Sequence, residues 1–483
     1  MSFRLIDLAK PFGSILPEIE GPYTQLNFDE KVVYTMASAI IYILAQLPLA
    51  GVSQSAFAAS ADPIYWLRPI FAAERGTLLE FGVFPIISTG LILQLLASLR
   101  LIRVNFTVRS ERELFQNLQK IFALFQYFAL TNLFLLSGYF GTGLSLVQVI
   151  LINVQIFLAG GFFTLISEVI DKGYGFGSGA LTFTAVNVAT NFVGDVIGIN
   201  SIETAPEVYE KQGALANLIS GLGSKGIFTA IWESFTRTHL PNLIIVLICI
   251  AIVLACVYLQ NLRYDLSIRS NKARGVSSQY PIKLLYTGAL PLVFSFVLLF
   301  YINVIAYVTV VGIFNNDSEQ LAVKILGHYT ANGSNFSIDN LSLFGLFSPA
   351  SSLIGSLLSP IRTIVFSLFV VYTSVKFAQV WSVTQGSGPR DIAAQFKEQG
   401  VTIYGVRDVS IAKYLKDQIP TAAVTGALCL AGLSIAGEFL GTNGRASGIV
   451  VAVGVSFSFL EIIASDYQQS GGSQNFGQIF GGF

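Results

Sequence analysis

Ten long apolar runs divide this chain, and each is close to the roughly 20 residues that a helix needs to cross a bilayer. Hydrophobic residues make up 53% of the sequence and charged residues 12%, whereas soluble domains carry about 25% charged residues. The sequence therefore predicts an all-α polytopic membrane protein with ten transmembrane helices. The clearest runs are 32–49, 78–99, 121–137, 146–169, 180–198, 243–259, 284–311, 364–380, 421–440 and 446–463.

Basic residues orient this stack of helices. Arginines fill the loop after the second run, and two longer polar stretches that carry arginine, 263–283 and 386–417, follow the sixth and eighth runs. All three loops fall on the same side, which the positive-inside rule predicts to be cytosolic. Because the number of runs is even, both termini are expected on that side. The arginines of the first loop are Arg100, Arg103, Arg109 and Arg112.

The opposite face carries the features of a lumenal surface. Segment 312–343 holds four Asn-x-Ser/Thr acceptors, whose context is a surface loop of a secretory compartment. Asn105 also lies in such a motif, but on the predicted cytosolic side, so it is expected to stay unmodified. The four lumenal acceptors are Asn316, Asn332, Asn335 and Asn340.

The ten runs divide into five and five. Such halves in membrane proteins are often inverted repeats around a central path, and we expect that arrangement here. The predicted units are a cytosolic amphipathic N-terminal segment at 1–30, a first half at 31–199, a lumenal connection at 200–238, a second half at 239–464 and a flexible cytosolic tail at 465–483.

The segment between the first and second runs is too short and too rich in proline to cross the membrane. It reads DPIYWLRPIF at 62–71. One interpretation is an interfacial helix on the lumenal surface. The other is a re-entrant segment, since irregular backbone at membrane depth persists only when it is buried in protein or lines a water-filled cavity.

The sequence contains few residues of the kinds that enzymes use for catalysis. The chain has two histidines, His239 and His328, and no pattern typical of a metal site or a Ser-His triad. Glu168 and Asp171 lie one helical turn apart, and the preferred interpretation is a solvated cap at a helix end. We expect no catalytic residue, no metal and no cofactor, and therefore not an enzyme.

A secondary transporter of a small solute is the alternative function. Ion-coupled carriers place ionisable residues near mid-membrane in spite of their cost. The seventh run, 284–311, contains no charged residue. The runs instead supply apolar side chains, which suit a closed hydrophobic constriction. This favours a pore over a transporter.

Several motifs, in order along the chain, resemble the SecY-type protein-conducting channel family, specifically its eukaryotic alpha subunit in the ER translocon. They are DPIYWLR at 62–68, RGTLLEFGV at 75–83, RELFQ at 112–116, DKGYGFGSG at 171–179, YPIKL at 280–284 and PRDIA at 389–393. LILQLL at 91–96, VNF at 104–106 and YQQSGG at 467–472 resemble the second alpha-subunit paralogue of budding yeasts in particular.

The resemblance implies two pseudo-symmetric five-helix halves around an hourglass pore, closed by a plug at about 62–73, here called the plug segment. Spans two, three, seven and eight would line a lateral gate. The plug residues are Asp62, Pro63, Tyr65, Trp66, Leu67 and Arg68, and the pore ring is Val83, Ile87, Ala180, Thr184, Val293 and Val451. Gate positions are Ser88, Tyr301 and Asn303, where Tyr301 stands in place of the family's usual asparagine.

The resemblance also implies partners and a location in the endoplasmic reticulum membrane. Nascent polypeptides and signal sequences would pass through the pore or leave sideways into membrane lipid, and small single-span gamma and beta subunits would complete a heterotrimer. A ribosome would dock on the cytosolic loops through Lys272, Arg274 and Arg407. Because Val406 replaces a usual basic neighbour, the second loop is expected to bind more weakly.

Overall fold

The computed structural model describes most of the chain. The described residues are 4–13, 16–24, 26–52, 62–106, 108–141, 143–205, 208–224, 226–237, 240–270, 277–332, 335–338, 342–350, 352–384, 388–404 and 411–469. All structural statements below concern these residues.

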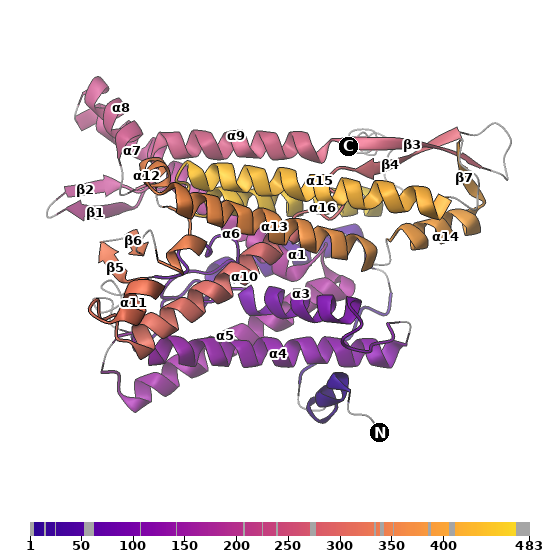
Figure 1. The fold of residues 1–483 in the computed structure, drawn as a ribbon, viewed down its shortest axis with the longest axis horizontal. Helices are drawn as coiled ribbons and strands as arrows, with labels where there is room; N and C mark the ends of the chain where they lie inside the picture. The colour runs from indigo at the N-terminus through magenta and orange to yellow at the C-terminus, as the bar shows by residue number, and fades with distance from the viewer. Residues whose placement is uncertain are drawn as a thin grey trace.

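Ten long helices lie alongside one another and form the body of the molecule (Figure 1). They are α1 (Phe28–Leu44), α3 (Phe84–Ser98), α4 (Arg109–Leu136), α5 (Leu146–Val169), α6 (Gly179–Ile197), α9 (Leu243–Gln260), α10 (Leu290–Tyr307), α13 (Pro360–Thr384), α15 (Ile411–Phe439) and α16 (Arg445–Gln469). Eight helices among the described residues are long and apolar enough to cross a membrane. The other two, α1 and α3, have 17 and 15 residues. The predicted fold class is confirmed.

The second span begins later than the sequence predicted. The run at 78–99 was expected to be helical throughout, but α3 begins at Phe84, with Pro85 in its first turn. Gly82 before it has a φ of 51°, and a Cβ atom there would clash with the carbonyl oxygens of Phe71 and Ala72. A left-handed glycine that packs against another backbone ends the series of turns before the helix and sets where the helix starts.

Shorter elements gather at the two ends of the bundle (Figure 1). One end carries β1 (Ser201–Ala205), β2 (Val208–Lys211), α7 (Ala214–Ser224), α8 (Ile227–Thr236), α11 (Leu321–Leu326), β5 (Tyr329–Asn332), β6 (Asn335–Ile338) and α12 (Leu353–Leu358). The other end carries η1 (Leu5–Phe12), β3 (Arg263–Ser270), β4 (Ser277–Lys283), α14 (Pro389–Gln399) and β7 (Val401–Ile403). The short helical turns η2 (Ile170–Tyr174) and η3 (Val308–Ile313) directly follow α5 and α10, and η4 (Gly345–Phe347) precedes α12.

The two predicted cytosolic loops join in a single folded unit. Strands β3 and β4 form an antiparallel hairpin, and β7 from the second loop pairs with β3, with Ile268 opposite Ile403. Below this sheet, α14 and the first turns of α15 supply a separate apolar core that includes Phe396 and Leu415. Stretch 386–417 is therefore largely structured. The predicted contacts Lys272, Arg274 and Arg407, with Val406, lie outside the described residues.

The start of the first span and the end of the last span meet at this end of the bundle. Lys31 of α1 forms an ion pair with Asp466 of α16 at 2.6 Å, and Lys283 at the end of β4 pairs with Glu461 of α16. Helix α16 continues to Gln469, so the first residues of the predicted flexible tail at 465–483 belong to the last helix.

Candidate functional site

The plug segment lies inside the bundle. Trp66 is 1% exposed and Phe71 is fully buried, so the re-entrant interpretation is confirmed and the interfacial helix is wrong. Trp66 meets Phe296 of α10 and Phe366 of α13 edge-on, with ring centroids 6.0 and 5.7 Å apart. Phe71 meets Phe300 of α10 at 5.7 Å. Aromatic pairs in this geometry contribute about 0.5–1.5 kcal/mol beyond the area they bury.

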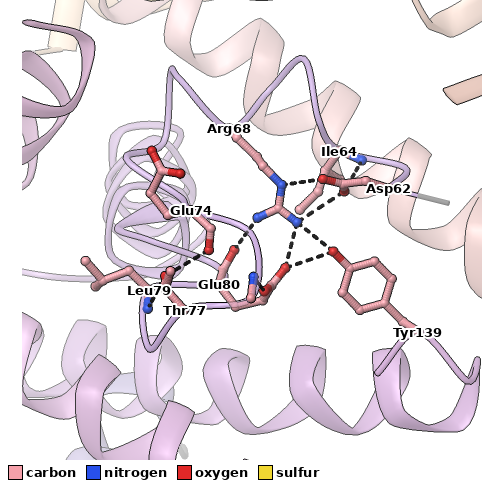
Figure 2. A network of polar contacts seen from close by, with 9 residues as sticks. Asp62, Ile64, Arg68, Glu74, Thr77, Leu79, Glu80 and Tyr139 are labelled. Atoms are coloured by element: carbon pink, nitrogen blue, oxygen red, sulfur yellow. Dashed lines mark hydrogen bonds and ion pairs between the residues drawn. The ribbon is translucent and has the colours of Figure 1, made fainter. Parts of the chain in front are cut away.

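A buried charge network fixes the plug segment to the start of the second span (Figure 2). The Arg68 guanidinium donates to both Asp62 carboxylate oxygens, at 2.5 and 3.1 Å, and to the Glu80 carboxylate and carbonyl, at 2.6 and 2.9 Å. The Tyr139 hydroxyl lies 2.9 Å from Arg68 and donates to Glu80 at 3.1 Å. The Gly76 amide donates to the second Glu80 oxygen at 2.6 Å.

This network holds one guanidinium and two carboxylates, so its charges do not balance. Its stability therefore depends on additional hydrogen bonds to the carboxylates. Glu80 is completely buried, and Asp62 and Arg68 are 5% and 7% exposed. Buried charges are tolerated only when they are paired and their remaining hydrogen-bonding capacity is satisfied. The donors from Tyr139 and Gly76 meet that condition for the second carboxylate. Arg68 is therefore the residue on which the plug's position depends.

Backbone hydrogen bonds tie the plug segment to its surroundings as well. The Val83 amide, at the start of α3, donates to the Phe71 carbonyl at 2.9 Å. The Tyr42 hydroxyl of α1 donates to the Ala72 carbonyl at 3.0 Å. Because buried carbonyl groups need partners, these contacts allow irregular backbone to lie among the spanning helices.

The turn between α15 and α16 holds the plug segment from the second half of the chain. Gly444 has a φ of 84°, and a Cβ atom there would clash with the Trp66 carbonyl. The Glu438 carboxylate accepts from the Gly444 amide at 3.0 and 3.1 Å and from the Ser447 hydroxyl at 2.7 Å. A buried carboxylate thus shapes the turn so that bare backbone packs on the plug.

The predicted pore ring is buried where the plug meets the spans. Its members come from the start of α3, from α6, from α10 and from α16. Five of them belong to the same continuous apolar cluster as Trp66 and Phe71, and Thr184 is also fully buried, with its hydroxyl donating to the Ala180 carbonyl at 3.3 Å. The five are Val83, Ile87, Ala180, Val293 and Val451. Their role as a ring around moving polypeptide stays a prediction.

The predicted gate residues do not all come together. The Ser88 hydroxyl of α3 donates to the Gln126 side-chain oxygen of α4 at 2.9 Å, and the Gln126 amide donates to the Tyr301 hydroxyl of α10. A polar chain thus crosses three helices. Asn303 instead donates to the Leu299 carbonyl of its own helix at 2.8 Å.

Sequence reasoning missed Gln126, although an amide side chain within an apolar span was a usable signal. It also missed the contact between α10 and α13, where the Ser295 and Ser374 hydroxyls lie 2.7 Å apart and the Thr373 hydroxyl donates to Ser295 at 2.8 Å. Small hydroxyl residues that look unremarkable in a sequence often join helices inside membranes.

The interpretation of Glu168 and Asp171 as a solvated cap is wrong. Glu168 is 8% exposed and forms ion pairs with Lys120 at 2.7 Å and Lys172 at 3.0 Å. Asp171 accepts from the Gly179 amide at 2.8 Å. The acids pack α4, α5 and the following turn together. Lys172 lies one helical turn from Glu168 and could have been predicted as its partner, whereas Lys120 lies on another helix and could not.

A cavity of about 560 Å³ opens beneath the plug segment at the end of the bundle that carries α7 and α8. Arg68 and Glu74 line one wall. Asp195 of α6 and Arg445 of α16 line another and form an ion pair at 2.5 Å that joins the two halves. Burial raises the pKa of the Glu74 carboxyl group, which a hydrogen bond from Asn191 at 3.3 Å opposes.

A segment of the same chain that is buried among spanning helices, with a cavity beneath it, is the arrangement of a plugged membrane channel. The family comparison agrees: the SecY family matches residues 77–460, and the plug domain of Sec61p matches residues 40–76. The chain belongs to the SecY family.

Relatives cover the whole length of the chain. The Sec sixty-one protein homolog of Saccharomyces cerevisiae is 47% identical over 482 residues, which are 99% of this chain and 98% of that protein. The protein transport protein SEC61 subunit alpha of Neurospora crassa is 34% identical over 471 residues, 96% of this chain and 97% of that protein. The predicted resemblance to the alpha subunit, and to a second yeast paralogue, is confirmed.

Solved structures share the fold. The idle yeast Ssh1 complex bound to the yeast 80S ribosome contains a chain with a TM-score of 0.77 and 45% identity, with 98% of each chain covered. A protein conducting channel at 24% identity has a TM-score of 0.75, with 96% of this chain and 97% of that chain covered. The chain is therefore a pore-forming subunit of a protein translocation channel, not an enzyme and not a carrier of small solutes.

We predict that Arg68→Met releases the plug segment. Two buried carboxylates would lose their cation, at a cost of about 3–5 kcal/mol. The measurement is the alkylation rate of Leu67→Cys, a fully buried position, in a chain whose three native cysteines are replaced. We expect at least a tenfold increase.

The matched control for this experiment removes the charges together with the cation. Arg68→Met combined with Asp62→Asn and Glu80→Gln leaves no unpaired buried charge, so alkylation should rise much less. An unchanged rate in Arg68→Met alone would show that the network does not hold the plug.

Proposed function

We propose that this chain works in the endoplasmic reticulum membrane, where it passes nascent polypeptides into the lumen and releases transmembrane segments sideways into lipid. The observation that carries the proposal is the contact between plug and constriction, where the Val83 amide donates to the Phe71 carbonyl. The plug segment is irregular rather than helical. It can therefore move away from the proposed constriction by breaking such contacts, without unfolding a helix. Sec61 in the canine ribosome-channel complex comes from the same membrane.

The lateral exit in this proposal lies between α3 and α4 on one side and α10 and α13 on the other. The polar chain from Ser88 through Gln126 to Tyr301 crosses that boundary among apolar side chains. Phe84 and Phe300 stack beside it, with centroids 3.5 Å apart. An apolar segment arriving from the pore replaces these contacts with its own, so the polar chain sets how hydrophobic the segment must be.

A docked ribosome is the proposed cytosolic partner, and small single-span gamma and beta subunits complete the assembly. Support comes from the joined sheet of β4, β3 and β7, which places both arginine-bearing loops on one folded unit. Ribosomal RNA presents a dense phosphate surface, which arginine binds bidentately. The Ssh1 relative is itself bound to the yeast 80S ribosome. In this arrangement both termini are cytosolic and the 200–238 connection is lumenal.

Charge reversal at Arg274 and Arg407 is expected to weaken ribosome binding. Each lost phosphate contact should reduce the slope of log affinity against log salt concentration by roughly 0.7–0.9. Co-sedimentation with ribosomes over a salt series measures this. Arg109→Glu, with a side chain 91% exposed at the same end of the bundle, is the control. Equal salt slopes for all variants would show that the loops only orient the chain in the membrane.

Tyr301→Phe is expected to let less hydrophobic segments leave the channel sideways. The variant keeps the aromatic contact with Phe84 but removes the hydrogen bond from Gln126, worth about 0.5–1.5 kcal/mol, so opening should become roughly two- to tenfold more favourable. Membrane insertion of reporter segments of graded hydrophobicity measures the shift. Tyr372→Phe, on the exposed side of α13, should behave like the wild type, and an unshifted threshold in Tyr301→Phe contradicts the role.

The proposed topology predicts glycosylation at Asn332 or Asn335 and none at Asn105. Removal of glycans by endoglycosidase should change the mobility of the wild type, and less or not at all after replacement of Asn332 and Asn335 by Gln. A glycan on Asn105 would invert the orientation of the whole chain.

A further inference from the structure

Helix α8 carries an apolar surface that no described part of the chain covers. At about 100° per residue, its five large apolar side chains occupy an arc of about 140°. Thr229, Glu233 and Thr236 form an adjoining polar stripe. The apolar residues are exposed by 63% at Ile227, 90% at Phe228, 41% at Ile231, 72% at Trp232 and 36% at Phe235.

The remaining side of α8 is already used for packing against α7. Ala230 is 2% exposed and Ser234 is fully buried, and Gly221 of α7 lies against Ala230. The exposed apolar arc is therefore not the surface on which α7 packs. The hairpin has three distinct sides: a packed seam, a polar stripe and a free apolar surface.

Helix α7 extends the same apolar surface. Leu215, Ile219 and Leu222 are 40%, 69% and 42% exposed and fall on one face at helical spacing. Across 214–236 the sequence carries only two charged residues, Lys225 and Glu233. Such a low charge is unusual for a connection surrounded by water.

The position of the hairpin points to lipid as the covering partner. Both helices contact α9, and α8 projects beyond the outer side of α9 at the end of the bundle (Figure 1). Helix α9 presents its own exposed apolar stripe to the bilayer, which includes Leu247 and Leu254 at 57% and 65% exposed. The apolar surface of the hairpin therefore lies beside a spanning helix whose own exposed side chains are apolar.

We propose that the α7–α8 hairpin lies in the lipid leaflet at this end of the bundle, with its apolar arc among the upper acyl chains and its polar stripe toward water. Trp232 stands at the border between the arc and Thr236, the place where tryptophan settles at membrane interfaces. The connection between the two halves is then a membrane-surface anchor rather than an aqueous loop. This proposal does not depend on which polypeptides the channel carries.

Trp232 offers a natural probe of this proposal. The chain has three tryptophans, and Trp66 and Trp381 are 1% and 2% exposed. In the complete complex reconstituted into phosphatidylcholine vesicles, the emission that is lost in Trp232→Phe reports on the arc. We expect lipids brominated at acyl positions 6 and 7 to quench that emission at least twofold, and aqueous iodide to quench it little.

Two other outcomes overturn the proposal. Strong quenching by iodide without quenching by brominated lipid would place the arc in water. Quenching by neither would show that a partner protein or a second copy of the chain covers it.

A pair of charge variants tests the arc itself. Phe228→Asp puts a carboxylate into the apolar surface and should lower quenching of Trp232 by brominated lipid at least twofold. Thr229→Asp, one residue further on the polar stripe, should leave it unchanged. Both side chains point away from the side of α8 that packs on α7, so neither substitution should unfold the hairpin. Equal quenching in the two variants would contradict the assignment of the arc to lipid.

Discussion

Irregular backbone inside a membrane bundle must find all its hydrogen-bond partners within the protein, because lipid supplies none. The plug segment meets that constraint through Arg68. One guanidinium neutralises charge from Asp62 and Glu80 while it also donates to the Glu80 carbonyl. Without that cation, two buried carboxylates would keep their neutral hydrogen-bond donors but lose the charge that balances them.

The contacts of the plug are divided between the two halves of the chain. The charge network and the bonds to Val83 and Tyr42 belong to the first half. The aromatic contacts with α10 and α13, and the close approach of Gly444, belong to the second. A relative movement of the halves therefore strains one set of plug contacts or the other.

The sequence predicted what depends on composition and on local motifs. The ten spans follow from run length. The buried plug follows from Pro63 and Pro69 in a segment too short to cross, together with the motifs at 62–68 and 75–83. The sequence did not predict Gln126, the ion pair of Lys120 with Glu168, or the pairing of β7 with β3. Each of these joins residues far apart in the chain, and which partner lies opposite is decided by helix packing rather than by local pattern. The late start of α3 had a local cause, Gly82, but its conformation depends on the carbonyl groups of the plug.

Pairing of β7 with β3 couples two spanning helices mechanically. Strand β4 leads after a short turn into α10, and β7 is followed closely by α15. Backbone hydrogen bonds between the strands resist shear, so a pull on either loop is shared by both helices. Helix α10 carries the aromatic residue that packs on Trp66, and α15 ends at the turn that holds Gly444 against the Trp66 carbonyl. A load applied to the strands therefore reaches the plug through two separate contacts.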